Sequence, residues 1–160
     1  MQRPLKQSFA IRKFTHEDCT AILECLRLAF APYRESYTPE AFSDTVLIPD
    51  TFRNRLSEMS VVVATSTSGE VVGTVAYKVL EGGEGHLRGM CPEWHGSGLS
   101  TSLLQTVEDE LKKAGCKTIT LDTTEPLRRA IRFYEQNGYR PTGKVGYFFG
   151  MPLFEYSKSI

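Results

Sequence analysis

Hydrophobic residues recur along this chain at two spacings, which predict where helices and strands lie. Apolar residues at steps of three and four are typical of a helix, whereas short apolar runs or strict alternation are typical of a strand. The helical spacing is clearest from Leu99 to Leu111, where positions 99, 103, 104, 107 and 111 are apolar. The run Val61–Ala64 is apolar at every position, which indicates a strand buried on both faces.

Applied along the chain, these spacings predict one mixed α/β domain over residues 1–160. Strands are expected at 9–14, 61–64, 71–79, 87–91 and 118–122, with a closing aromatic hairpin at 147–156. Helices are expected from Thr15 to Phe30, over about 50–59, at 99–113 and before Gly138. Gly73 inside its strand predicts a bulge. The expected fold is a central, largely antiparallel sheet with helices on both faces.

The segment Trp94–Ser100 stands between a predicted strand and the predicted helix at 99–113. Gly96 and Gly98 lack a Cβ, so the backbone can turn tightly at this junction. A strand-to-helix turn of this kind directs backbone N–H groups outward at the positive end of a helix dipole, which favours a phosphate. Two glycines alone are equally compatible with a turn that only joins two elements.

A second segment, Ala130–Tyr139, closes a short amphipathic helix. Pro126 is expected in the first turn of this helix, where its missing N–H costs nothing. Gly138 is expected as the left-handed residue that ends it. One face is formed by Leu127, Ala130, Ile131 and Tyr134.

Together the two segments resemble the GNAT superfamily of acyl-CoA-dependent N-acyltransferases. The phosphate loop of that family reads Arg/Gln-x-x-Gly-x-Gly/Ala, and its slots are filled here by His95, Gly98 and Ser100. The later motif, Ala-x-x-Phe/Leu-Tyr-x-x-x-Gly-Phe/Tyr, is matched by Ala130, Phe133, Tyr134, Gly138 and Tyr139. The segment 11–18 also looks like the family's first strand and the entry to its first helix, so the resemblance covers nearly the whole chain.

The resemblance implies a splayed pair of parallel strands, with the pantetheine of acetyl-CoA in the gap between them. Acetyl-CoA is the expected co-substrate, and no metal is expected. The residues expected to hold acetyl-CoA are Met90, Cys91, His95, Gly96, Ser97, Gly98, Leu99, Ser100, Arg128 and Arg129. The chain departs from the family pattern at His95, Ser97, Ser100 and Leu127, and these changes reduce fixed positive charge while keeping the backbone donors. Arg128, Arg129 and Arg132 either restore that charge or form a solvated helix face.

Acetyl transfer to an amine needs a neutral amine, donors for the oxyanion and a proton for the departing thiolate. Tyr134 occupies the position that the family uses for the proton donor; the alternative is a ring that only packs in the core. Glu84 and His86 are two residues apart, so they face the same side on or just before the fourth strand. Some family members carry the general base there. A water molecule could serve as the base instead. We interpret Cys91 as a buried thiol rather than a nucleophile, since no activating group has a defined place beside it.

The acceptor site is expected at two aromatic segments that occupy the family's acceptor region. Its candidate residues are Tyr33, Tyr37, Tyr147 and Phe148, although core packing explains such aromatics equally well. The acceptor could be a small amine, an amino acid, an antibiotic or a protein N-terminus. Transfer is expected to be direct, in a ternary complex. The alternatives are an acyl-CoA-binding or sensing domain without turnover, and a scaffold that binds no CoA.

Composition narrows the class of partner. The chain has 160 residues, with 19 Lys and Arg against 19 Asp and Glu, so it lacks the basic excess that nucleic-acid binding normally needs. No apolar run approaches a membrane span, and no signal-peptide core follows the N-terminus. The four cysteines have neither paired nor metal-ligand spacing, which indicates reduced thiols and a cytoplasmic location. A homodimer is an expectation from the family alone.

Overall fold

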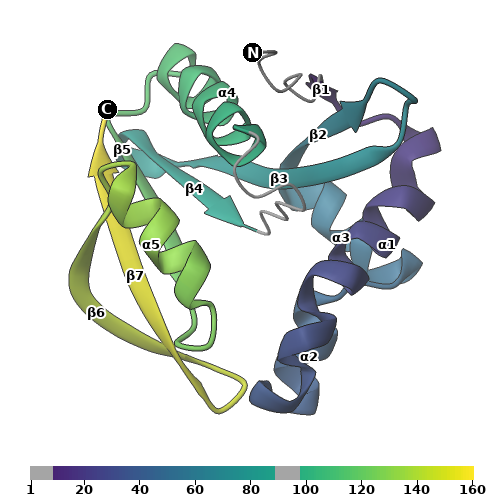
Figure 1. Ribbon diagram of the computed structural model, residues 1–160. Coiled ribbons are helices and arrows are strands. Elements are labelled where there is room, and N and C mark those ends of the chain that lie inside the picture. The colour runs from purple at the N-terminus through teal and green to yellow at the C-terminus, as the bar shows by residue number, and fades with distance from the viewer. Residues whose placement is uncertain (1–8, 89–97) are drawn as a thin grey trace, which may run out of the picture.

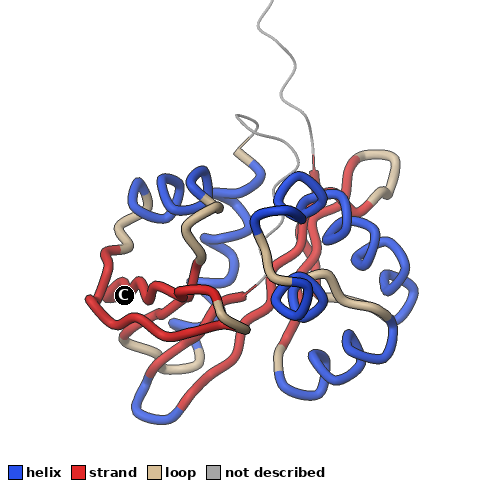
Figure 2. The backbone as a smooth tube through the Cα atoms, turned by 90° about the horizontal axis from the view of Figure 1, so that it is seen from below, coloured by secondary structure: helices blue, strands red, loops and turns tan. Residues whose placement is uncertain are grey.

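The computed structural model describes residues 9–88 and 98–160, which form one layer of strands covered by helices on both sides (Figure 2). The strands are β1 (Phe9–Lys13), β2 (Ser60–Ser66), β3 (Val71–Leu80), β4 (Glu84–Arg88), β5 (Thr118–Thr123), β6 (Arg140–Phe148) and β7 (Met151–Ser159). The α-helices are α1 (Cys19–Phe30), α2 (Pro39–Thr45), α3 (Pro49–Glu58), α4 (Leu99–Lys113) and α5 (Arg128–Gln136). Short 3₁₀ turns, η1 (His16–Asp18), η2 (Ala31–Ser36) and η3 (Glu81–Gly83), complete the described elements.

The strands form a seven-stranded sheet in the order β1-β2-β3-β4-β5-β7-β6. Every neighbouring pair is antiparallel except β4 and β5, which are parallel and are connected through α4. This confirms the expected largely antiparallel sheet with one parallel pair. The bulge predicted at Gly73 is present beside it: Ala64 faces Gly73 and Thr65 faces Val71, so Val72 is the extra residue.

Alternation along the central strands divides the core into two layers. Val61 and Val63 pack with α1 and α3, whereas Val62 and Ala64 pack with α4. A Cβ built on Gly85 of β4 would come within 2.7 Å of Cδ1 of Leu111, so glycine is needed there for α4 to approach the sheet. Helix α5 contributes Ile131, Phe133 and Tyr134 to the edge of the α4 layer.

The described pairing of β4 with β5 ends before β5 does. Among residues 9–88 and 98–160, its last register pair is Leu87 with Leu121, and β5 continues to Thr123. In Figure 1 the two halves of the sheet, β1–β4 and β5–β7, diverge toward the bottom of the view. The segment before α2 spans this divergence: the Tyr37 hydroxyl is 2.7 Å from the Thr124 Oγ1, and the Thr38 hydroxyl donates to the Phe149 carbonyl oxygen at 2.8 Å.

The closing hairpin is longer than its aromatic residues indicated. It runs over β6 and β7 instead of 147–156, and its turn holds Phe149 at φ 49° and Gly150 at φ 84°. In β6, Pro141 faces Tyr156 and Val145 faces Phe154, so residues 142–144 stand opposite Glu155 alone. This wide bulge interrupts the outer strand at its midpoint.

One local prediction was wrong, and one helix was not predicted. Pro126 lies before α5, which begins at Arg128, because a turn closed by the bond from the Leu127 N–H to the Thr124 carbonyl oxygen precedes the helix. Between α1 and β2 the structure has η2 and α2 as well as the expected helix, which runs as α3. Helix α2 was missed because it is only seven residues long and buries Ala41 alone, so it has no apolar stripe.

In the described part of the chain, no helix is long and apolar enough to span a membrane.

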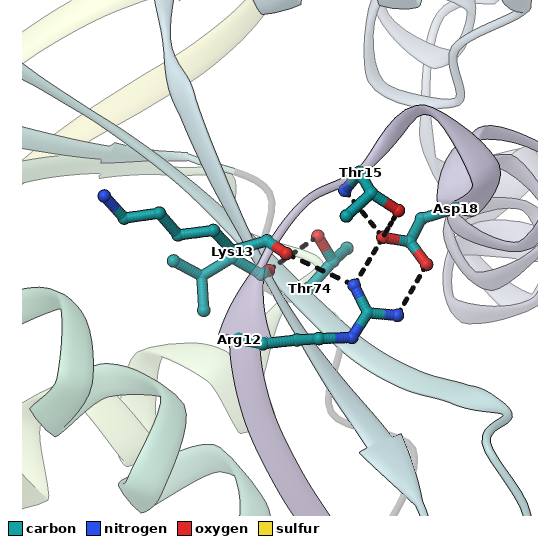
Figure 3. Close-up of polar contacts among 6 residues, drawn as sticks. Arg12, Lys13, Thr15, Asp18 and Thr74 are labelled. Carbon is teal, nitrogen blue, oxygen red and sulfur yellow. Dashed lines mark hydrogen bonds and ion pairs between the residues drawn. The ribbon is translucent and has the colours of Figure 1, made fainter.

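An ion pair fixes β1 to the start of α1 (Figure 3). Arg12 donates to both carboxylate oxygens of Asp18, at 2.7 and 2.8 Å, and the Thr15 N–H donates to the same carboxylate at 2.8 Å. Asp18 is only 6% exposed. These contacts lower the pKa of Asp18 from its usual value to about 2, chiefly through the Arg12 hydrogen bonds. The carboxylate therefore stabilises the fold in its charged form.

We expect Asp18→Asn to reduce the free energy of unfolding at pH 7 by about 2 kcal/mol, the range for hydrogen bonds to charged groups. The native pKa lies below the unfolded value of about 3.9, so the carboxylate's contribution is complete above pH 4 and is lost as the pH falls toward 2. Denaturant unfolding at several pH values measures the difference between parent and variant. Asp50→Asn, at an exposed carboxylate 3.8 Å from Arg53, is the matched control and should change little. A gap between parent and Asp18→Asn that persists unchanged at pH 2 would contradict this assignment.

Candidate functional site

A cavity of about 150 Å³ lies where β4 and β5 separate. Its polar wall comes from the ends of the two strands, with His86 and Arg88 on β4 and Asp122 and Thr123 on β5. The remaining lining residues are Leu26, Phe30, Tyr37, Thr45, Arg55, Leu87, Thr124, Leu127, Phe148 and Leu153. Residues from α1, α2, α3 and the final hairpin thus meet the carboxyl ends of the parallel strands, where open sheets commonly bind ligands.

His86 is held by side chains of β5. Its Nδ1 is 2.9 Å from the Thr120 Oγ1, and the Thr120 hydroxyl donates to the Gly85 carbonyl oxygen at 3.4 Å. This pair of contacts favours the tautomer in which Nδ1 carries the hydrogen and Nε2 the lone pair. Nε2 lies 3.7 Å from Oδ2 of Asp122. The ring therefore presents a proton-accepting nitrogen next to a carboxylate.

Burial shifts the pKa values of this pair in opposite directions. The pKa of His86 is lowered, chiefly by burial, although the charge of Asp122 opposes that shift. The pKa of Asp122 is raised, again chiefly by burial. Lowering the pKa of His86 favours its neutral form at neutral pH, which is the form that can accept a proton.

Two arginines border the same cavity. Arg88 forms an ion pair with the carboxylate of Asp44 on α2, and its guanidinium lies 5.7 Å from the centre of the Phe148 ring. Arg55 on α3 donates from Nη2 to the Asp44 carbonyl oxygen at 3.3 Å. Burial and the charge of Arg88 lower the pKa of Arg55 to about 10, so it stays protonated at neutral pH.

A larger groove of about 610 Å³ adjoins the cavity. Phe30 and Leu127 line both spaces, so they form the wall between them. The groove is further lined by Tyr33, by Ser100 of α4 and by Tyr134 of α5. Arg129 and Arg132 of α5 contribute positive charge to it.

The end of α5 fixes the backbone at Tyr134. The Tyr134 carbonyl oxygen accepts the Tyr139 N–H at 3.0 Å, and the Gly138 N–H donates to the Glu135 carbonyl oxygen at 3.2 Å. With Gly138 at φ 94°, these bonds form a Schellman motif. The Tyr134 and Tyr139 rings meet edge to face at 5.7 Å between centroids, the apolar contact that accompanies the motif. Gly138 therefore has the expected role of left-handed helix terminator.

Helix α4 begins at the groove. Gly98 precedes it at φ 84°, a conformation that disfavours other residues, and its carbonyl oxygen accepts the Ser102 N–H at 3.0 Å. The Ser100 and Thr101 amides fall within the first turn, which has no acceptors of its own for them. This end of the helix can attract an anion.

The structure brings some of the predicted site residues together and separates others. His86, Tyr37 and Phe148 line the cavity, whereas Tyr134, Tyr33, Ser100 and Arg129 line the groove. Leu99, the first residue of α4, is fully buried in the core. Glu84 begins β4 opposite Thr118 and does not line the cavity, and Arg128 instead faces Glu125 at 3.7 Å. Tyr147 is 78% exposed and lies outside the cavity. Five of the residues predicted to hold acetyl-CoA lie outside the described residues: Met90, Cys91, His95, Gly96 and Ser97.

Three charged residues that line the cavity, and Asp44 as the ion-pair partner of one of them, were not predicted. Arg88 and Asp122 could have been found, because each stands at the carboxyl end of a parallel strand with the parity of His86 or Thr120. Asp44 and Arg55 belong to separate helices and gave no comparable signal. Over residues 9–88 and 98–160, no group of three or more His, Cys, Asp or Glu side chains is placed to hold a metal ion.

Comparisons with known proteins agree with this geometry. A model of the acetyltransferase (GNAT) family matches residues 22–139. Over 86 residues the chain is 34% identical to the uncharacterized protein YdhI of Bacillus subtilis (strain 168). That match covers 54% of this chain and 53% of YdhI, so it spans about half of that relative.

Solved structures share the fold over nearly the whole chain. An acetyltransferase of the GNAT family from Staphylococcus aureus Mu50 has a TM-score of 0.76 at 17% identity, covering 95% of this chain and 99% of its own. The PaiA N-acetyltransferase from Thermoplasma acidophilum, solved in complex with coenzyme A, has a TM-score of 0.71 at 22% identity. The match covers 96% of this chain and 99% of the PaiA chain. The family match over 118 consecutive positions, 22 to 139, and the parted parallel strands lead to one conclusion: the chain belongs to the GNAT acetyltransferase family, whose members transfer acyl groups from acyl-CoA.

Proposed function

We propose that this protein transfers the acetyl group of acetyl-CoA directly to a primary amine in a ternary complex. The observation that carries the proposal is the pair of adjoining spaces that share Phe30 and Leu127. One space offers a proton acceptor at His86 and the other a phenol at Tyr134. Two substrates bound in these spaces would meet beside Phe30 and Leu127. Free thiols at Cys19, Cys25 and Cys116 favour a cytoplasmic location.

The groove residues fit acetyl-CoA. The start of α4 can receive the pyrophosphate on backbone amides, and Arg129 and Arg132 offer charge for the phosphates. After Leu87 and Leu121, the last register pair of β4 with β5 among the described residues, an extended pantetheine could reach strand backbone. When bound, acetyl-CoA supplies the thioester carbonyl that the amine attacks.

His86 is the better of the two candidate bases. It lines the cavity, and burial lowers its pKa, so Nε2 can accept a proton from the amine. Asp122, 3.7 Å from Nε2, would stabilise the imidazolium that results. Glu84 lies at the opposite end of β4 and lacks access to this cavity.

Tyr134 is our candidate for the proton donor to the departing thiolate. The Schellman motif and the Tyr139 ring hold its backbone and ring in one position. A fixed donor needs little rearrangement during the reaction, which favours catalysis over simple binding. The alternative, an acyl-CoA-binding domain without turnover, gives no role to the His86–Asp122 pair.

The first test concerns acetyl-CoA binding. Gly98→Val should abolish the stabilisation that acetyl-CoA gives, because a β-branched residue at φ 84° distorts the start of α4. Thermal unfolding with and without acetyl-CoA measures this; at 100 times the dissociation constant the parent should gain about 2.7 kcal/mol. Gly69→Val is the matched control, since Gly69 has φ 86° in the β2–β3 turn, remote from the groove. Equal ligand-induced stabilisation of Gly98→Val and the parent would exclude this binding site.

The second test concerns the base. His86→Gln should lower kcat/KM for the amine by roughly 10²- to 10⁴-fold. In the parent, kcat/KM should rise with pH through an apparent pKa below 6.5, because burial lowers the pKa of His86 and only the neutral ring accepts a proton. The variant should lack this rise when both are assayed with the same amine. Glu84→Gln is the comparison: a greater loss there than in His86→Gln would transfer the role to Glu84.

The third test concerns the acid and the activity as a whole. Release of CoA thiol from acetyl-CoA should require an amine, and Tyr134→Phe should reduce its turnover rate by roughly 10²- to 10⁴-fold. The Michaelis constants should change much less, since the hydroxyl acts in the transition state. Steady-state assays of both proteins measure this, and a series of thioesters with poorer leaving groups exposes the defect if thiolate departure does not limit the rate. Near-parental turnover of Tyr134→Phe across that series contradicts the assignment, and no amine-dependent thiol release by the parent contradicts the enzyme.

A further inference from the structure

Arg55 is a partly buried cation, and no carboxylate of a described residue forms an ion pair with it. Its one hydrogen bond to a described residue goes to the Asp44 backbone, although a guanidinium carries five donors. No carboxylate of residues 9–88 or 98–160 lies within ion-pair distance of it. A guanidinium that is partly removed from water gains from a charged partner, because part of its hydration is lost. An anion in the adjacent cavity would supply the missing partner.

Arg88 does not relieve this excess of positive charge. The Asp44 carboxylate is its ion-pair partner, so Arg55, Arg88 and Asp44 together carry one net positive charge. The repulsion between the two arginines is one of the causes that lower the pKa of Arg55 to about 10. This part of the cavity therefore favours a negatively charged group.

A proton-accepting site lies beside these cations on the same wall. His86 and Arg88 are two residues apart on one face of β4, roughly 7 Å along the strand. The Asp122 carboxylate next to His86 attracts a protonated amine before reaction. The cavity thus presents opposite charges a few ångströms apart, and its ligand should carry the complementary pair.

We propose that the acceptor is a small amino acid or a close analogue, with its amine toward His86 and Asp122 and its carboxylate toward Arg55 and Arg88. This inference rests on the proposed acetyl transfer and narrows its acceptor class. The volume of about 150 Å³ suits a small molecule, since a cavity of that size holds a ligand such as benzene. An amine without a carboxylate would leave Arg55 unpaired and would be repelled by both cations.

The parent protein tests this without any substitution. Thiol release is measured with pairs of acceptors that share a side chain: each amino acid, its carboxamide and the corresponding decarboxylated amine. We expect the free acids to have the higher kcat/KM, by roughly 10- to 100-fold, the range for a hydrogen bond to a charged group. Each compound is compared at the same fraction of deprotonated amine, so that differences in amine pKa do not produce the preference.

Two variants of α3 then assign the preference to Arg55. Arg55→Met should reduce the acid-to-amide ratio of kcat/KM by at least 10-fold, whereas Arg55→Lys, which keeps the charge, should retain part of it. Arg53→Met is the matched control, because Arg53 lies on the same helix, is 79% exposed and is outside the cavity. A purely structural role for Arg55 would lower the rates with acid and amide alike and leave their ratio unchanged.

The outcomes separate the two proposals. If amino-acid amides and simple amines are acetylated at least as efficiently as amino acids, this inference is overturned. The proposal of acetyl transfer would still stand. An acid-to-amide ratio unchanged in Arg55→Met would also overturn it. Absence of amine-dependent thiol release with every compound would refute acetyl transfer, and this inference would fail with it.

Discussion

The parting of β4 from β5 is the constraint on which the described site depends. Among residues 9–88 and 98–160, the last register pair of these parallel strands is Leu87 with Leu121. The next residues, Arg88 and Asp122, then border a cavity. Side chains of α1, α3 and the final hairpin complete the walls, so elements from across the sequence contribute to one small space.

Charges in this region are arranged by burial as much as by pairing. His86 loses affinity for a proton because its ring is only 19% exposed, and Asp122 gains it for the same reason. Arg55 remains charged although it is partly buried. The charges of Asp122, Arg55 and Arg88 are the basis of the ligand polarity that we infer for the cavity.

Most of the fold could be predicted from the sequence, because its periods are local. The stripe Leu99, Leu103, Leu104, Val107 and Leu111 defines α4, and each of these residues is buried. Helix α2 could not be predicted, since contacts to remote segments hold it: Thr38, which caps it, bonds to Phe149, 111 residues later. The same distinction applies to the site. His86 follows from strand parity, whereas the neighbourhood of Arg55 and Arg88 arises only when separate helices and strands pack.

The wide bulge in β6 has a consequence for the behaviour of the protein in solution. An outer strand with an unbroken row of N–H and C=O groups is a template for pairing with other chains. In β6 the row is broken where residues 142–144 bow out opposite Glu155, and the exposed strand also carries Arg140, Pro141 and Lys144. Continuous strand addition at this edge is thereby obstructed, which protects the sheet against aggregation.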